Sequence, residues 1–187
     1  MCIRDRRYTV NEPAAVLAVT VDAFTDVDCR GNQTGSIDIT TTGGNVSGGY
    51  TYVWTNSGGI VLPMQTEDLS NIGAELYTLI ATDSKGCQAT VSQLISEPLQ
   101  NLSSTPVLTD ILCNGQSTGS IDPVIGGGTP GYTYAWSDGS TGSTLTGVPA
   151  GTYGLTVTDA NACTDTYSYT LTEPSAPLDL VLTGTDI

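Results

Sequence analysis

Cysteine thiols and carboxylates are the side chains of this 187-residue chain that could do chemistry, because the chain contains no histidine. Without histidine there is no Ser-His-Asp or Cys-His catalytic group, no imidazole acid or base, and no His-ligated zinc. Four cysteines recur at regular spacing and are candidates for disulfide bonds. They are Cys29, Cys87, Cys113 and Cys163. No C-x-x-C pair is present, so a cysteine metal site is disfavoured.

The carboxylates are the second candidate group. Asp and Glu number 19 against 5 Lys and Arg, a net charge of −14, which argues against nucleic acid or an anionic membrane surface as a partner. Oxygen-rich loops can hold Ca²⁺, so six aspartates at matching positions are candidate ligands. They are Asp26, Asp38, Asp83, Asp110, Asp122 and Asp159. No D-x-D-x-D-G loop is present, so turn capping and a solvating negative surface are favoured. We expect no other cofactor. Catalysis by a carboxylate pair is disfavoured, because every repeat would carry the same pair.

These residues recur because the chain is an internal repeat. Glu-Pro occurs at 12–13, 97–98 and 173–174, and between these points the same blocks recur in the same order. The block C-x-G-x-x-T-G-S-I-D stands at 29–38 and 113–122. The other two blocks are G-Y-T-Y-x-W, at 49–54 and 131–136, and Y-x5-D-x3-C, at 77–87 and 153–163.

The repeat sets the expected domain organisation. Residues 1–6 look like a translated sequencing adapter, so we treat them, with Cys2, as an artefact on a metagenomic fragment of a longer array. We expect the last strand of a preceding repeat at 7–13, repeat 1 at 14–98, repeat 2 at 99–174, and the first strand of a truncated third repeat at 175–187. No apolar run of about 18 residues is present, so we expect no membrane insertion in this segment.

Each repeat is expected to be an immunoglobulin-like sandwich. In 151–159 apolar and polar residues alternate, which predicts a half-buried strand, and the turn after it predicts a hairpin. About seven short strands per repeat, with a Trp on the third, are typical of this fold. The fold class is therefore all-β, with two tandem β-sandwiches flanked by fragments of neighbouring repeats. Four aromatic residues are predicted in the cores, and Tyr50 and Tyr132 are candidates for stacking on a sugar. The core set is Trp54, Trp136, Tyr77 and Tyr153.

Taken together, the three blocks and the closing T-E-P resemble the SprB repeat of large cell-surface proteins from gliding and other Bacteroidota. The resemblance covers nearly all of 7–187. Repeat 1 departs from it at 55–76, which is longer, and at Glu75-Leu76, which replaces Gly-Thr before Tyr77. The resemblance implies an exported adhesin array at the cell surface, delivered by the type IX secretion route and used in adhesion or gliding.

We therefore expect a non-enzymatic adhesin segment, extracellular or at the cell surface, whose partners are neighbouring repeats and an extracellular surface or glycan. The alternative is an accessory sugar- or Ca²⁺-binding module of a secreted polysaccharide-degrading enzyme. For the cysteines, an oxidising compartment favours pairing within each repeat, Cys29 with Cys87 and Cys113 with Cys163. In a simple sandwich, however, the two partners sit at opposite ends. Free thiols, or bridges between neighbouring repeats, therefore stay open.

Overall fold

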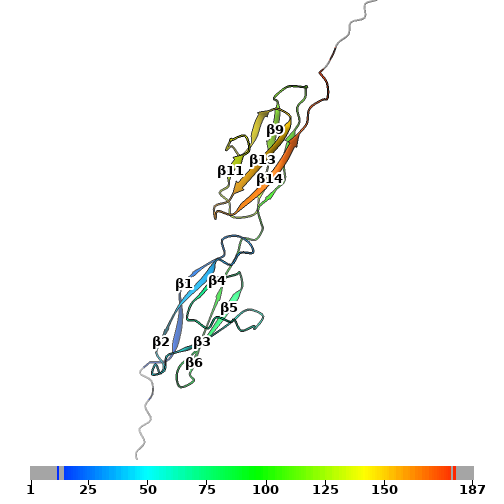
Figure 1. The fold of residues 1–187 in the computed structure, drawn as a ribbon. Helices are drawn as coiled ribbons and strands as arrows, with labels where there is room; N and C mark the ends of the chain where they lie inside the picture. The colour runs from blue at the N-terminus through cyan, green and yellow to red at the C-terminus, as the bar shows by residue number, and fades with distance from the viewer. Residues whose placement is uncertain (1–11, 13–14, 178, 180–187) are drawn as a thin grey trace, which may run out of the picture. The chain divides into compact units, whose positions relative to one another are not determined.

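The computed structural model describes residues 12, 15–177 and 179, and these residues form β-strands and turns without a helix. They therefore include no helix that is long and apolar enough to cross a membrane. The chain divides into two compact units (Figure 1). The first holds the described residues up to Val27 together with 31–97, and the second holds 28–30 together with the described residues from Pro98 onward.

The first unit is a sandwich of two antiparallel three-stranded sheets, β1-β2-β4 and β3-β5-β6. This arrangement places the first, second and fourth strands opposite the third, fifth and sixth, as the A, B, E and C, F, G strands of immunoglobulin-like domains are placed. The strands are β1 (Ala18–Thr25), β2 (Gly35–Thr42), β3 (Thr51–Thr55), β4 (Leu69–Ile72), β5 (Leu76–Thr82) and β6 (Gln88–Leu94).

The second unit repeats this topology, with sheets β8-β9-β12 and β11-β13-β14 and a short extra pair, β7-β10. The extra pair arises because Pro106 and Pro123 interrupt two strands that are continuous in the first unit, since proline cannot donate to the ladder. The strands are β7 (Ser103–Ser104), β8 (Val107–Thr109), β9 (Gly119–Asp122), β10 (Ile125–Gly126), β11 (Thr133–Trp136), β12 (Leu145–Val148), β13 (Gly151–Thr158) and β14 (Thr164–Leu171).

Each unit buries its own apolar core between its sheets. Trp54 is fully buried in the first, and Trp136 is 4% exposed in the second. Tyr77 is buried, and Tyr153 is half-buried against the second core. These aromatics lie where the period of two along the strands predicts.

The structure confirms the all-β, immunoglobulin-like fold class and the β13–β14 hairpin. It differs in strand number, because the described part of each unit has six strand positions where about seven were expected. The segments at 56–68 and 137–144, between the third and fourth positions, form no regular strand and contribute one isolated bridge, Thr55 to Val61. The expected fragments at 1–6, 7–13 and 175–187 lie wholly or largely outside the described residues.

Candidate functional site: the repeated turns and a disulfide

A buried aspartate closes the last hairpin of each unit. Asp83 and Asp159 are each 5% exposed. One carboxylate oxygen of Asp159 accepts from the backbone N–H groups of Asn161 and Cys163, both at 2.9 Å, and the other accepts from Thr129 N–H at 2.8 Å. The carboxylate therefore ties the β13–β14 turn to the loop before β11.

Asp83 makes the same three contacts in the first unit. Its oxygens accept from the N–H groups of Lys85 and Cys87, both at 2.9 Å, and of Asn45 at 2.8 Å. The backbone hydrogen bond from Asn45 is the main reason that the pKa of Asp83 lies below its ordinary value, because the bond favours the charged form. Both carboxylates are thus held by the backbone of their own unit.

A glycine lets the loop approach each of these carboxylates. Gly44 and Gly128 have φ of +65° and +59°, a region that L side chains rarely adopt. A Cβ on Gly128 would lie 2.6 Å from Asp159 Oδ2, and one on Gly44 would lie 2.9 Å from Asp83 Oδ2. The Gly-Gly sequence before each G-Y-T-Y-x-W block is therefore a steric requirement of the carboxylate tie.

Another pair of aspartates holds the opposite end of each unit. Asp26 Oδ1 accepts from Ser96 N–H at 2.7 Å, and Asp110 Oδ1 accepts from Thr172 N–H at 2.6 Å. The backbone completes the tie, because Ile111 N–H donates to Thr172 O at 3.0 Å. The opening loop of each repeat is thereby fixed beside the end of the last strand.

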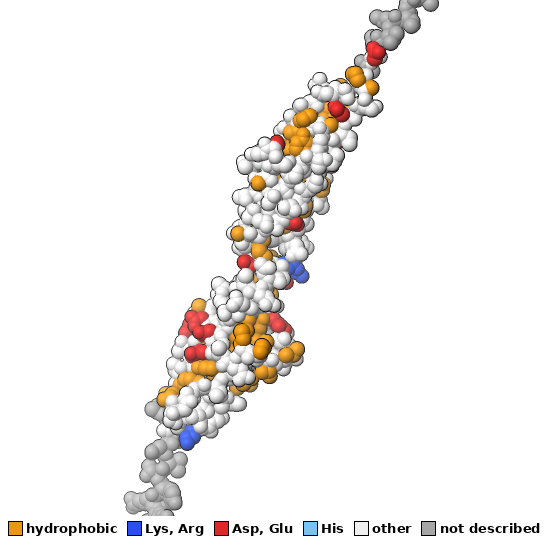
Figure 2. Space-filling model, viewed as in Figure 1, with side chains coloured by type: hydrophobic (Ala, Val, Ile, Leu, Met, Phe, Trp, Pro, Cys, Tyr) orange, Lys and Arg blue, Asp and Glu red, His pale blue; other side chains and the backbone are white. Residues whose placement is uncertain are grey.

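The third pair, Asp38 and Asp122, lies exposed on the second strand position. The pKa of Asp38 is raised, chiefly by the negative charge of Asp68, with a smaller contribution from Asp22. Figure 2 shows acidic side chains gathered on one part of the first unit. Among the described residues no group of three or more His, Cys, Asp or Glu could hold a metal ion. The six candidate ligands for Ca²⁺ are thus spread over three separate places in each unit.

The tyrosines proposed for sugar stacking are engaged within their own units. Tyr50 and Tyr132 are half-buried, and each hydroxyl donates to a glycine carbonyl of the Gly-Gly loop, Gly43 O and Gly127 O, at 2.7 Å. Tyr132 also packs against the second core. These contacts give both rings a structural role in holding the loop.

The other aromatic residues are anchored in the same duplicated way. The indole N–H groups of Trp54 and Trp136 donate to Thr66 O at 3.1 Å and Gly142 O at 2.8 Å. The hydroxyls of Tyr77 and Tyr153 donate to carbonyls four residues earlier, Gly73 O at 3.1 Å and Pro149 O at 2.8 Å. Burial of these rings therefore leaves no polar atom of theirs without a partner.

The disulfide differs from the favoured pairing. Cys29 is bonded to Cys163, with their Cα atoms 5.7 Å apart, and Cys87 and Cys113 are free and exposed. Pairing within a repeat fails for a geometric reason. The opening loop lies beside the end of β14, whereas Cys163 comes just before its start, and the eight residues of β14 span about 26 Å at about 3.3 Å each. A disulfide needs Cα atoms within about 7 Å.

The bond has a supporting set of contacts in the second unit. Asn161 Nδ2 donates to Asp28 O at 3.0 Å, and Arg30 Nη1 donates to Pro98 O at 3.3 Å and to Leu99 O. These contacts explain why residues 28–30 belong to the second unit although they follow β1 in the chain. The bridge therefore joins a cysteine of the first sequence repeat to a cysteine of the second, which was one of the open alternatives.

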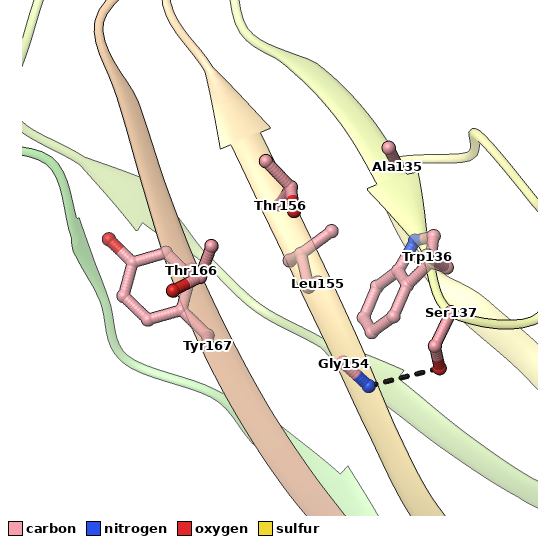
Figure 3. A pocket seen from close by; sticks show the side chains of 8 residues that line it. All are labelled: Ala135, Trp136, Ser137, Gly154, Leu155, Thr156, Thr166 and Tyr167. Atoms are coloured by element: carbon pink, nitrogen blue, oxygen red, sulfur yellow. Dashed lines mark hydrogen bonds between the residues drawn. The ribbon is translucent and has the colours of Figure 1, made fainter.

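A shallow hollow of about 440 Å³ lies in the second unit, and its lining includes hydroxyl-bearing Ser137, Thr156 and Thr166 (Figure 3). Gly154 is among the lining residues, and its N–H donates to Ser137 Oγ at 3.1 Å. The first unit has Thr78 at the position of Gly154, and its hydroxyl pairs with Ser92 at 2.9 Å. Sequence reasoning did not find this hollow, although the Thr-to-Gly difference between the repeats was a visible signal.

Three solved multi-domain structures resemble the chain at low similarity. They are the three N-terminal domains of the bacteriophage RB49 outer capsid protein Hoc (13% identity, TM-score 0.45), the N-terminal eight Ig domains of Down Syndrome Cell Adhesion Molecule (12%, 0.44), and extracellular domains 3–5 of Drosophila OTK (16%, 0.41). They cover 83%, 86% and 85% of this chain, which spans only 58%, 25% and 62% of theirs. None of the curated protein sequences compared with the chain matches it.

The family model of the SprB repeat matches the chain twice, at residues 21–59 and 105–141. Each match contains the C-x-G-x-x-T-G-S-I-D and G-Y-T-Y-x-W blocks. In the structure these blocks form the opening loop with the second strand and the third strand of each unit. Two segments of the chain, one in each repeat, therefore match the SprB repeat.

Proposed function

We propose that this chain is a non-enzymatic repeat segment of a bacterial cell-surface adhesin, secreted across the cell envelope and used as a stalk or an adhesive array, with gliding motility as one setting. The observation that carries the proposal is the duplicated use of its polar side chains. Asp83 and Asp159, and likewise Asp26 and Asp110, hold the same turns in both units. A spacer built from repeated domains needs each domain to carry the same residues that hold its fold, and these aspartates meet that need.

The charge of the chain supports a role at the cell surface. With 19 acidic and 5 basic residues, the segment carries a large net negative charge, which favours solubility in an exposed position. Proline in each Glu-Pro junction fixes φ, which limits bending of the chain there. Both properties suit a segment that holds a terminal binding domain away from the cell.

Recovery of the complete reading frame tests the proposal most directly. We expect further repeats of the same pattern and a C-terminal sorting domain. As an independent test, antibodies raised against the purified chain should label intact cells of the source organism without permeabilisation. A hydrolase domain in the same frame, or labelling only after permeabilisation, would contradict the adhesin proposal.

The second candidate function, a sugar-binding module of a polysaccharide-degrading enzyme, is favoured by the hydroxyl-lined hollow around Gly154. Gly154→Thr, which copies Thr78 of the first repeat, should place a side chain inside the hollow and narrow it. The substitution is sterically tolerable, because a Cβ at Gly154 would lie 3.7 Å from its nearest neighbour, Ser137 Cβ. If the module binds sugar there, the native chain will bind a soluble polysaccharide in gel-shift assays and Gly154→Thr will not. Equal migration of both proteins would remove this candidate.

A further inference from the structure

The two free cysteines of the described residues are the repeat counterparts of the two bonded ones. Cys113 occupies in repeat 2 the place of Cys29 in repeat 1, and Cys87 occupies in repeat 1 the place of Cys163 in repeat 2. Each exposed thiol therefore belongs to a segment that, in its other copy, takes part in a disulfide.

The loop that carries Cys113 is held as the loop that carries Cys29 is held. Gly115 N–H donates to Glu173 Oε2 at 2.6 Å, and in the first repeat Gly31 N–H donates to Glu97 Oε2 at 2.7 Å. Asn114 Nδ2 also donates to Pro174 O at 2.9 Å, as the Arg30 guanidinium donates to Pro98 O. The Cys113 loop thus has the internal ties of a loop that forms the bridge.

A hollow lies on the surface of the first unit beside Cys87. Its volume is about 290 Å³. It is lined by Glu12, Ala15, Val16, Leu17, Gly44, Cys87 and Gln88. Val16 is 87% exposed, so an apolar side chain stands in water at its edge. The counterparts of Cys87 and Gly44 in repeat 2 are Cys163, which binds Cys29, and Gly128.

Exposed apolar side chains stand both on the free loop and at the edge of the hollow. Leu112, next to Cys113, is 81% exposed, and it stands where the first repeat has Asp28. Ala15 and Val16 stand where the second repeat has Gln100 and Asn101, as the matching bonds from Gly44 N–H to Ala15 O and from Gly128 N–H to Gln100 O confirm, both at 2.9 Å. The Cys29–Cys163 bond therefore joins a loop that carries Asp28 to a repeat that carries Gln100 and Asn101. The free pair offers an exposed leucine beside the loop thiol and a hollow in which Ala15, Val16 and Leu17 lie beside the polar Glu12 and Gln88.

From this match we propose that Cys113 of one copy of the chain forms a disulfide with Cys87 of a second copy, whose hollow receives Leu112. The occupant of the hollow is thus the C-x-G loop of another SprB repeat. Within the described residues the loop of repeat 2 and the hollow of repeat 1 each present a free thiol, so a bond between two copies joins a loop to a hollow, as the Cys29–Cys163 bond joins the loop of one repeat to the last hairpin of the next.

Bond formation requires an oxidant, and a small-molecule disulfide such as oxidised glutathione supplies it. The Cys113 thiolate attacks the glutathione disulfide and releases one glutathione thiolate, which leaves a mixed disulfide on Cys113. The Cys87 thiolate of the second copy then attacks the Cys113 sulfur and releases the second glutathione. The two protein thiols lose two protons and two electrons, and one glutathione disulfide becomes two thiols.

The test uses the full chain with Cys2→Ser in every sample. Cys87→Ser, which keeps Cys113, and Cys113→Ser, which keeps Cys87, are given different mass labels, mixed in equal amounts and oxidised with glutathione disulfide. Linked pairs are resolved by non-reducing electrophoresis and mass spectrometry. We expect the mixed pair to exceed each same-variant pair by about tenfold, the ratio that a modest difference in docking free energy produces. Random coupling makes the mixed pair only twice as abundant as each same-variant pair, and that ratio would overturn the proposal.

Two surface substitutions separate docking from simple thiol exposure. Leu112→Asp copies Asp28 of the first repeat, and Val16→Asn copies Asn101 of the second. Both sites are highly exposed, so the fold should persist, and the Cys29–Cys163 bond serves as an internal control. We expect either change to reduce the excess of the mixed pair to the random ratio. An unchanged excess would show that the apolar match does not guide the pairing.

Discussion

The carboxylate of Asp159 should contribute more to the stability of the second unit than any exposed acidic side chain does. Asp159→Ala removes the acceptor of three backbone N–H groups, from Thr129, Asn161 and Cys163. Asn161 is exposed, so water can replace part of its bond, whereas the groups nearer the interior are left without an equivalent partner. With about 1.5 kcal/mol for each of the two bonds from Thr129 and Cys163, the lower end for hydrogen bonds to a charged group, the expected loss is about 3 kcal/mol.

The assay uses the fact that each unit has a single tryptophan, Trp54 in the first and Trp136 in the second. In a Trp54→Phe background, fluorescence reports on the second unit alone. A domain of this size shifts its Tm by about 4–8 °C per kcal/mol, so Asp159→Ala should lower the transition by about 12–24 °C. The control is Asp138→Ala, because Asp138 is exposed and holds only a local turn through Ser140. A shift no larger than that of the control would refute the structural role of Asp159.

Three further predictions concern the same ties. Tyr132→Phe should destabilise the second unit by about 1 kcal/mol, because the hydrogen bond to Gly127 O is lost while the ring still packs. Urea unfolding followed by tryptophan fluorescence measures this loss, and an unchanged midpoint would contradict the prediction. The lowered pKa of Asp83 means that its stabilising effect is complete above the ordinary value of 3.8 and is lost as the pH falls through the lower folded value. When the pH is lowered, the native chain should therefore lose the tryptophan fluorescence of its folded first unit at a lower pH than Asp83→Asn does. Coincident titration curves would exclude a stabilising role for the Asp83 carboxylate. Reduction of the Cys29–Cys163 bond, which closes a loop of 134 residues, should lower the free energy of unfolding by up to about 5 kcal/mol. Identical thermal unfolding curves with and without reductant would show that the bond does not stabilise the fold.

The fold could be predicted from sequence because its determinants are local and repeated. Alternation at 151–159 and the aromatic spacing of 131–136 fix which side chains face the core, and the structure buries Leu155, Val157 and Trp136 accordingly. The strand number was less predictable. Pro106 and Pro123 break two strands of the second unit, and the chain between the third and fourth positions forms no regular strand in either unit.

The candidate site was harder to predict, because the partners of its side chains are backbone groups far along the chain. The Y-x5-D-x3-C block pointed to Asp83 and Asp159, yet nothing in it says that Asn45 and Thr129 supply the third hydrogen bond. The glycine pair before the G-Y-T-Y-x-W block was the available signal, since it marks a loop that must pass close to another group. Carboxylates that serve as backbone acceptors also look the same in sequence as carboxylates that bind calcium.

The cysteine pairing shows which comparison within the sequence is most informative. Matching positions established that the two repeats share their folding contacts, such as the ties of Asp26 and Asp110. The shared sheet topology of the two units does not require a difference between Asp28 and Leu112, because both residues lie on the opening loop, outside the core. Under the docking proposed above, the difference between Asp28 and Leu112, like that between Val16 and Asn101, would govern which loop pairs with which repeat. The shared residues of the two repeats describe the fold of the unit, and the exposed differences beside the shared cysteines are the positions at which the pairing experiment tests specificity.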